Sequence, residues 1–328
     1  MSRSEQITVF LAAHGFAAAE AVPLAPDAGF RRYLRLSGGP RPALLMDAPA
    51  PEDVRPFLRM AGHFASVGLC VPEIIAADEE AGLVLEEDFG DALLSVILDR
   101  EDAQTLFDAA IDVLLHMQAY PAPAGLPRWD AAAMRDATLG PLCDWWWPAA
   151  FGGPCPDAVR ADFAAALDAT LRLLRADVLV HRDFFAGNLI WLPDRIGVRR
   201  IGIIDFQGAS LGDRVYDLVS LLEDARRDLS EEVRERGRAR YLAGQYGLDA
   251  RAFDTRFAVC AAQRHLRVAT QWVRLARRDG RPQYLVHGPR TWALLDRALH
   301  NPANAPLAAA MDRWIPPAMR ANPPNLPV

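Results

Sequence analysis

Three polar side chains in the middle of the chain have the types and the spacing that chemistry at a hydroxyl group requires. Asp183 precedes Asn188 by five residues, and Asp205 directly follows the apolar run Ile201–Ile204. A carboxylate such as Asp183 can accept or orient the proton of a hydroxyl group. An amide oxygen and a second carboxylate are ligands that a hard cation such as Mg²⁺ prefers. We therefore predict that Asp183 is a catalytic base and that Asn188 and Asp205 bind a metal ion.

The order of these residues is typical of a loop that transfers a phosphoryl group. The pattern H-R-D-x-x-x-x-N, followed by D-F-Q after an apolar strand, is far more specific than an isolated H-x-D. In phosphoryl transfer the protein orients a hydroxyl, holds Mg²⁺ on the nucleotide phosphates and neutralises developing charge. We therefore expect ATP and Mg²⁺ as cofactors. His181 and Arg182 are interpreted as structural residues of the loop, Arg182 through contacts with carboxylates.

The elements around these residues predict an α+β fold with a small mixed lobe and a larger, mainly helical lobe. In residues 1–89, short strands at 21–24, 30–36, 43–46 and 83–85 form an antiparallel sheet, with helices at 6–14 and after Pro51. In residues 90–328 the catalytic loop lies among helices, and the tail after Asn301 is expected to be extended. The expected elements of this lobe are helices at 106–117, 159–174, 215–222, 231–246, 256–278 and 289–300, a strand at 178–180 and a hairpin at 189–204.

The composition fits a globular enzyme that acts on small molecules. The net charge is −6, so no basic excess points to nucleic acid as a partner. No apolar run is long enough to span a bilayer, and residues 1–6 lack the apolar core of a signal peptide. Four scattered cysteines without a C-x-x-C pair indicate reduced thiols. We expect a cytoplasmic monomer without a membrane partner.

The chain contains no lysine, so all 36 basic residues are arginines. Nucleotide bias in a GC-rich genome accounts for this composition. It still has a chemical consequence, because any phosphate contact that lysine usually makes must here be made by another group.

The layout resembles the kinase-like fold of the aminoglycoside phosphotransferase family of small-molecule kinases. The resemblance covers nearly the whole chain and rests on H-R-D-F-F-A-G-N, I-I-D-F-Q and the segment Gly212–Leu218. Asp217, within that segment, is similar to a helix aspartate of the family that bonds the backbone of the catalytic loop. Protein kinases fit less well, because no A-P-E segment follows Asp205.

Within the family, several stretches are similar to the bacterial kinases that phosphorylate the 1-hydroxyl of N-acetylmuramate and N-acetylglucosamine recovered from cell-wall peptidoglycan. The resemblance implies an ATP-dependent kinase with an amino sugar as its acceptor. Two alternatives stay open: a kinase of the same fold for an aminoglycoside, choline or homoserine, and a nucleotide-binding pseudokinase without the phosphate-binding lysine. The stretches are Asp27–Tyr33, Leu45–Pro49, His181–Asn188 with Trp191, and Gln263–Leu266.

The nucleotide side of the site lacks its usual cation. The kinase pattern V-A-I-K would place a lysine near Met46, and the nearest substitutes are Arg31 and Arg32. Arginine can bind phosphate oxygens in a bidentate manner; the alternative is that both arginines only solvate an edge strand. A glycine turn and an inter-lobe hinge complete the expected contacts with the nucleotide. The predicted nucleotide-binding residues are Gly29, Arg31, Arg32, Glu87 and Phe89.

The acceptor side offers aromatic and charged candidates. Trp146 lies in the run Trp145–Trp147, and aromatic faces stack on sugars, although such a run also packs helices together. Arg264 could bind the lactyl carboxylate of N-acetylmuramate or lie on a solvated helix face. The predicted acceptor-binding residues are Arg135, Trp146, Asp213 and Arg264, and Asp217 is interpreted as scaffold.

Overall fold

The protein divides into two compact units. The computed structural model describes residues 1–24, 31–245 and 247–326. The first unit is Met1–Met117 with Ala186–Gly208, and the second is Gln118–Phe185 with Ala209–Val328. The expected boundary after residue 89 falls inside the first unit, because the chain beyond it pairs with the later hairpin. The N–H of Trp191, for example, donates to the carbonyl of Ala92.

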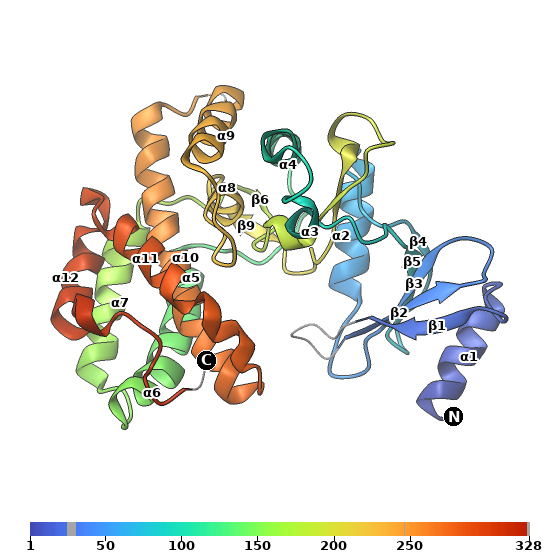
Figure 1. Ribbon diagram of the computed structural model, residues 1–328, viewed down its shortest axis with the longest axis horizontal. Coiled ribbons are helices and arrows are strands. Elements are labelled where there is room, and N and C mark those ends of the chain that lie inside the picture. The colour runs from blue at the N-terminus through green and yellow to red at the C-terminus, as the bar shows by residue number, and fades with distance from the viewer. Residues whose placement is uncertain (25–30, 246, 327–328) are drawn as a thin grey trace. The chain divides into compact units, whose positions relative to one another are not determined.

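The elements confirm an α+β fold with an antiparallel sheet in one unit and mostly helices in the other (Figure 1). The helices are α1 (Arg3–Ala13), α2 (Arg55–Ser66), α3 (Leu94–Ile97), α4 (Ala103–Gln118), α5 (Ala131–Leu139), α6 (Trp147–Phe151), α7 (Asp157–Leu171), α8 (Tyr216–Leu222), α9 (Glu231–Gly244), α10 (Ala250–Arg278), α11 (Gly288–Leu299) and α12 (Ala305–Trp314). The strands are β1 (Glu20–Pro23), β2 (Arg32–Ser37), β3 (Ala43–Asp47), β4 (Ile74–Asp78), β5 (Leu83–Glu87), β6 (Val178–Val180), β7 (Leu189–Trp191), β8 (Ile201–Ile203) and β9 (Ser210–Gly212).

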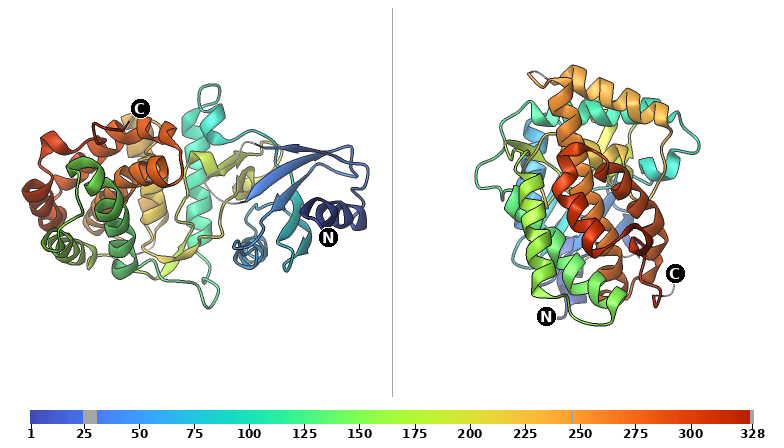
Figure 2. Two further views of the ribbon diagram at one scale, coloured as in Figure 1. Left: turned by 90° about the horizontal axis from the view of Figure 1, so that it is seen from below. Right: turned by 90° about the vertical axis from the view of Figure 1, so that its left-hand side faces the viewer.

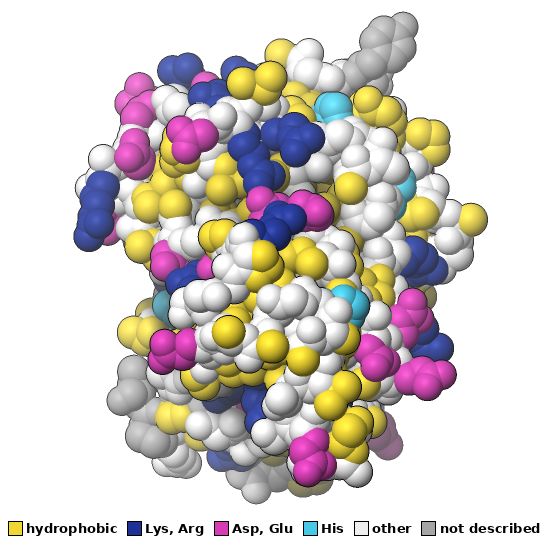
Figure 3. Space-filling model, turned by 90° about the vertical axis from the view of Figure 1, so that its right-hand side faces the viewer, with side chains coloured by type: hydrophobic (Ala, Val, Ile, Leu, Met, Phe, Trp, Pro, Cys, Tyr) yellow, Lys and Arg dark blue, Asp and Glu magenta, His cyan; other side chains and the backbone are white. Residues whose placement is uncertain are grey.

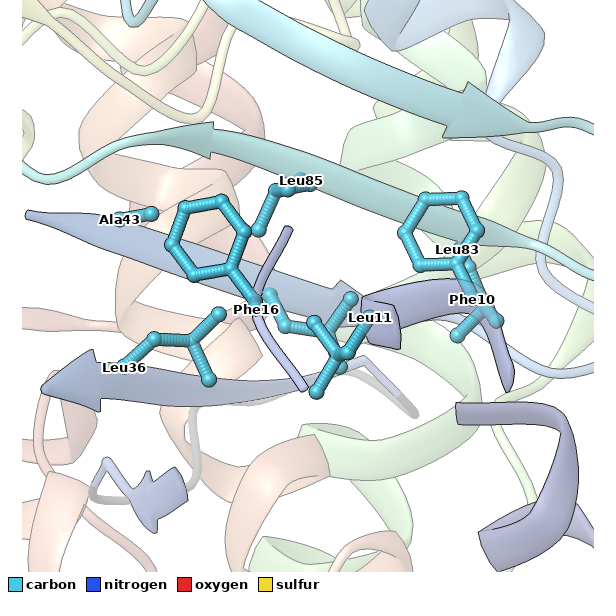
Figure 4. Close-up of a cluster of buried hydrophobic side chains, with 8 residues drawn as sticks. Phe10, Leu11, Phe16, Leu36, Ala43, Leu83 and Leu85 are labelled. Carbon is cyan, nitrogen blue, oxygen red and sulfur yellow. The ribbon is translucent and has the colours of Figure 1, made fainter. Parts of the chain in front are cut away.

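The sheet of the first unit has the strand order β1-β2-β3-β5-β4, and neighbouring strands are antiparallel. Leu36 and Leu85 point from one face of this sheet into a cluster of buried side chains (Figure 4). Phe10 of α1 and Phe16 of the turn after it cover that face. Because side chains alternate between the faces of a strand, the opposite face carries the residues in between. On β2 that opposite face carries Tyr33.

The second unit is built around the long helix α10. Asp249 caps its first turn by accepting a hydrogen bond from the N–H of Ala252. The helix packs against α5, α11 and a π-helical turn at Gly140–Trp146, and α7 packs against α5 and α12 (Figure 2). The short pair β6–β9 brackets the catalytic loop, with Val178 opposite Gly212. This framework fixes the position of the segment that contains Asp183.

The tail after Asn301 differs from the extended segment that the sequence predicts. It contains α12, which packs on α7 and buries Leu307 and Met311. Pro306 lies in the first turn of this helix, where a missing N–H costs no hydrogen bond. The prediction of an extended tail was therefore wrong.

Acidic and basic side chains are interspersed with hydrophobic ones on the face that Figure 3 displays. Among the helices that the structure describes, none combines the length and the apolar character needed to cross a membrane.

Candidate active site

The loop that carries the predicted base is anchored by a buried carboxylate on α8. Asp217 accepts hydrogen bonds from the backbone N–H groups of His181 (2.6 Å) and Arg182 (2.9 Å). Burial raises the pKa of Asp217, while the charge of His181 and these two N–H donors pull it down. This is the contact with the loop backbone that the family resemblance implies. It makes Asp217 part of the scaffold of the site.

The backbone is strained beside both predicted chemical groups. Arg182 and Asp205 have positive φ angles of 77° and 61°, and they are the non-glycine residues in that region among those described. Such conformations cost roughly 1–3 kcal/mol each and concentrate at functional sites. The guanidinium group of Arg182 stacks 4.0 Å from the centre of the Trp129 ring. Arg182 therefore holds the loop through an aromatic contact as well as through its backbone.

Asp183 lies among arginines. A guanidinium nitrogen of Arg264, on α10, is 3.8 Å from Oδ1 of Asp183, and another nitrogen of the same group donates to the carbonyl of Arg182 at 3.2 Å. Desolvation pushes the pKa of Asp183 up, but the charges of Arg264, Arg267, His181 and Arg226 outweigh it and hold the pKa below its ordinary value. The carboxylate is therefore ionised at neutral pH, as a base must be.

The two predicted metal ligands lie close together in the first unit. Nδ2 of Asn188 is 3.5 Å from Oδ2 of Asp205, and the hairpin β7–β8 joins the two positions. Phe206, the next residue after Asp205, stacks on Phe57 of α2 with ring centres 4.8 Å apart. Phe64 packs against the same ring edge-on at 5.5 Å. The buried aromatic contact thus fixes the backbone that presents Asp205.

The residues present fit a hard cation such as Mg²⁺. Nε2 of Gln207 donates to Oδ1 of Asp205 at 2.6 Å, and the buried Oε1 of Gln207 has no hydrogen-bond partner among the described residues. Asp205, Asn188 and Gln207 therefore offer carboxylate and amide oxygens, the donor type that Mg²⁺ prefers. Gln207 has no assigned role at the level of sequence. Its orphaned oxygen is a signal that only the folded chain reveals.

The two predicted phosphate ligands have different surroundings, although Arg31 and Arg32 are adjacent in the sequence. Arg32 is well exposed and pairs at 2.6 Å with Asp47, which Arg3 of α1 also contacts at 2.6 Å. Arg31 has a side chain only 14% exposed and donates from Nε to Glu52 at 2.9 Å. Nη1 of Arg31 is buried and has no hydrogen-bond partner among the described residues. Arg31 therefore has a donor available for a ligand, whereas Arg32 is committed to Asp47.

The charge of Arg31 affects ionisable side chains on the sheet face where the usual lysine would lie. Pairing places Tyr33 opposite Met46, and the same face carries Glu86. Burial raises the pKa of Glu86 to about 8, although the charge of Arg31 lowers it. Burial and the negative charges of Glu86 and Asp205 raise the pKa of the Tyr33 hydroxyl, which Arg31 counteracts. Arg31 and the candidate metal ligand Asp205 thus act on the same hydroxyl group.

Glu87 and Phe89, two further predicted nucleotide-binding residues, make contacts within the protein. The backbone N–H of Glu87 donates to the carbonyl of Glu73, and its side chain pairs with Arg195 at 2.5 Å. Phe89 packs against Cys70 and Ile190. Gly29 lies outside the described residues.

Three of the predicted acceptor residues make contacts with other parts of the protein, and none of the contacts described for them reaches Asp183. Trp146 is 1% exposed, donates from Nε1 to the carbonyl of Ala321 and packs against Trp292. This burial leaves no ring face for a sugar and favours the alternative that the tryptophans pack helices together. Arg135 pairs with Asp136 and Asp168. The buried Asp213 accepts from the N–H groups of Arg175 and Val215, which is a structural role.

Several residues around Asp183 were not singled out by the sequence reasoning. Arg267, one turn after Arg264 on α10, lies 5.8 Å from the ring centre of Trp129. Arg226 lies 4.2 Å from the ring centre of Phe185 in the catalytic loop. The spacing from Arg264 to Arg267 was the available sequence signal. Trp129 and Arg226 are distant in sequence, and only folding brings them to the loop.

The antiparallel sheet, the helical unit and a loop with an ionised aspartate are typical of a kinase-like phosphotransferase. The chain belongs to the phosphotransferase enzyme family, whose model matches residues 20–253. An N-acetylmuramate/N-acetylglucosamine kinase of Caulobacter vibrioides is 35% identical, with 94% of this chain and 95% of the relative covered. A kinase of the same name from Pseudomonas aeruginosa is 34% identical over 86% of this chain and 84% of the relative. These matches confirm the resemblance to a family of small-molecule kinases.

Solved structures show the same fold. A choline/ethanolamine kinase family protein from Mesorhizobium loti superposes with a TM-score of 0.65 at 15% identity, covering 95% of this chain and all (100%) of the other. A GDP complex of an aminoglycoside 2'-phosphotransferase has a TM-score of 0.63 at 15% identity, with 92% and 100% covered. At this identity the likeness identifies the fold and not the acceptor.

Proposed function

We propose that this protein is an ATP-dependent kinase that phosphorylates the anomeric 1-hydroxyl of N-acetylmuramate and N-acetylglucosamine. The observation that carries the proposal is the Asp183 carboxylate, which is held ionised by arginines on an anchored loop. Relatives of four species that carry this kinase name, at 33–35% identity, support the choice of acceptor. Phosphorylation of these sugars would serve the recovery of cell-wall material.

In the proposed reaction Asp183 accepts the proton of the anomeric hydroxyl as its oxygen bonds to the γ-phosphorus of ATP, and ADP leaves. An anomeric hydroxyl is more acidic than an ordinary alcohol, so a carboxylate with a lowered pKa is a sufficient base. Asn188 and Asp205 would hold Mg²⁺, with Gln207 as a further oxygen donor. When bound, the metal ion would neutralise charge on the transferred phosphoryl group.

The arginines around Asp183 distinguish this acceptor from those of other kinases with the same fold. Choline and aminoglycosides are cations, which carboxylates attract and guanidinium groups repel. In this chain Arg264, Arg267 and Arg226 all act on the pKa of the base. A neutral or anionic acceptor suits such surroundings. Since the four cysteines are free thiols, we place the reaction in the cytoplasm.

A substrate panel tests the proposal. Purified protein is incubated with ATP, Mg²⁺ and one acceptor at a time: N-acetylmuramate, N-acetylglucosamine, kanamycin, choline or homoserine. ADP release measures turnover, and phosphorus NMR identifies the phosphorylated oxygen by coupling to the anomeric proton. We expect turnover with the two amino sugars and a 1-phosphate product. A large preference for choline, homoserine or kanamycin would overturn the proposal.

A further inference from the structure

One face of α10 carries more positive charge than the neighbouring carboxylates neutralise. Arg264, Arg267 and Arg274 follow one another at intervals of three and seven residues, which places them on one side of an α-helix. Arg264 has its partners in Asp183 and the carbonyl of Arg182. Arg267 and Arg274 form no ion pair with any residue that the structure describes. The charge excess therefore begins one turn beyond the base.

The two unpaired arginines are partly buried. Nε of Arg267 and Nε of Arg274 are both buried and have no hydrogen-bond partner among the residues that the structure describes. Within the described part of the chain, the hydrogen bond of Arg267 is a long one, 3.5 Å from Nη2 to the hydroxyl of Tyr216. Burial lowers the pKa of Arg274, and the charges of Arg278 and Arg267 lower it further, while the charge of Asp279 opposes them. Buried donors without acceptors are costly, so these side chains are arranged for an anionic ligand.

Aromatic contacts hold Arg267 beside the catalytic loop. Its guanidinium group lies 5.8 Å from the ring centre of Trp129, and Arg182 stacks on the same ring at 4.0 Å. The charge of Arg267 also lowers the pKa of Asp183, second among the cations after Arg264. An anion bound by Arg267 would therefore be part of the molecule whose hydroxyl meets Asp183.

We propose that Arg267, supported by Arg274, forms an anion subsite that binds the lactyl carboxylate of N-acetylmuramate. This inference rests on the proposed function and extends it to the choice between the two sugars. N-acetylmuramate carries a carboxylate on the lactyl ether at O3, and N-acetylglucosamine has a hydroxyl there. The planar fork of arginine binds a carboxylate in a bidentate manner. Arg267 is thus a residue that determines specificity, whereas Arg264 positions the base.

Steady-state kinetics with both sugars separates this role from a general one. Arg267→Met keeps the apolar stem that packs near Trp129 and removes the charge. We expect the KM for N-acetylmuramate to rise about 10- to 100-fold, the range for loss of a charge-assisted hydrogen bond. The rates are compared at pH 8, where Asp183 is ionised with or without the charge of Arg267. The kcat/KM for N-acetylglucosamine should then fall far less than that for N-acetylmuramate, which also shows that the variant folds. Arg274→Met should raise the KM for N-acetylmuramate by a smaller factor. Arg267→Lys, which keeps the positive charge, should raise this KM less than Arg267→Met does.

Arg277→Met is the matched control, because Arg277 lies on an exposed part of the same helix and carries the same charge. This variant should leave the KM for each of the two sugars unchanged. In a second measurement, the wild-type protein should bind the methyl ester of N-acetylmuramate more weakly than the acid, since the ester has no charge. Equal losses for both sugars in Arg267→Met, or equal KM values for acid and ester, would overturn the subsite. Those results would leave the proposed kinase intact, whereas a wild-type protein inactive on both sugars would overturn both proposals.

Discussion

Arg264 places one guanidinium nitrogen 3.8 Å from Oδ1 of Asp183 and another 3.2 Å from the carbonyl oxygen of Arg182. One buried side chain on α10 thus contacts both the proposed base and the strained residue before it. The contact couples the helical core of the second unit to the catalytic loop. It explains why the Asp183 carboxylate can remain ionised although its surroundings are partly desolvated.

The first prediction concerns the pH dependence of this pair. Asp183 must be ionised to act as the base, and Arg264 is the cation that lowers its pKa most. Arg264→Met therefore raises the pKa of Asp183, and the acidic limb of the kcat/KM profile moves to higher pH. The shift should be the same for both sugars, and Arg264→Lys should reduce it. An acidic limb that stays in place would show that Arg264 does not control the base.

The second prediction separates the two arginines that precede and begin β2. Arg31 has a buried donor that no described residue pairs with, so Arg31→Met should weaken the binding of a non-hydrolysable ATP analogue about 10- to 100-fold. Arg32→Met is the matched control, because Arg32 is exposed and paired with Asp47. It should leave nucleotide affinity within about 2-fold. Calorimetric titration of both variants measures this difference, and a larger loss in Arg32→Met would reverse the assignment.

The third prediction concerns stability and the buried Glu86. In the folded protein burial keeps Glu86 protonated up to about pH 8, whereas the unfolded chain ionises it near its ordinary value of 4.5. The folded state therefore binds the extra proton between these values, and the unfolding free energy contributed by Glu86 falls as the pH rises through them. Glu86→Gln cannot ionise and should be more stable than wild type by roughly 2–5 kcal/mol at pH 8.

Urea denaturation at pH 5 and pH 8 measures this effect. The gain from Glu86→Gln should appear at pH 8 and be much smaller at pH 5, because pH 5 lies only just above the ordinary value of 4.5 at which the unfolded chain begins to favour the ionised form. Glu73→Gln, at an exposed carboxylate of the same unit, is the control and should show no such pH dependence. A gain of equal size at both pH values would exclude ionisation of Glu86 as the cause.

The candidate site residues that are local in sequence could be named from the sequence, and their roles stay predictions. Asp183, Asn188 and Asp205 come from one loop and the following hairpin, where spacing alone limits the geometry. The strand β2 likewise follows from alternating apolar and basic residues, and β3 and β5 follow from short apolar runs. The edge strand β4 was missed, because the sequence Ala76-Ala77-Asp78 has little β propensity.

Side chains that meet through tertiary packing could not be placed from the sequence. Trp129 and Arg267 are far apart in the chain, and the packing of α10 within the second unit brings them together beside Arg182. Trp146 illustrates the opposite case. Its ring could stack on a sugar if it were exposed, but it is buried against Trp292. Burial, which decides between these outcomes, depends on the whole fold.

Substitution of the base tests the central claim most directly. Turnover of N-acetylglucosamine by Asp183→Asn is measured together with the affinity of the variant for ATP. Because Asp183 acts on the acceptor hydroxyl and not on the nucleotide, we predict that kcat falls about 10²- to 10⁴-fold while ATP affinity stays within about 2-fold of wild type. Retained turnover, or loss of ATP binding with the same substitution, would contradict the account.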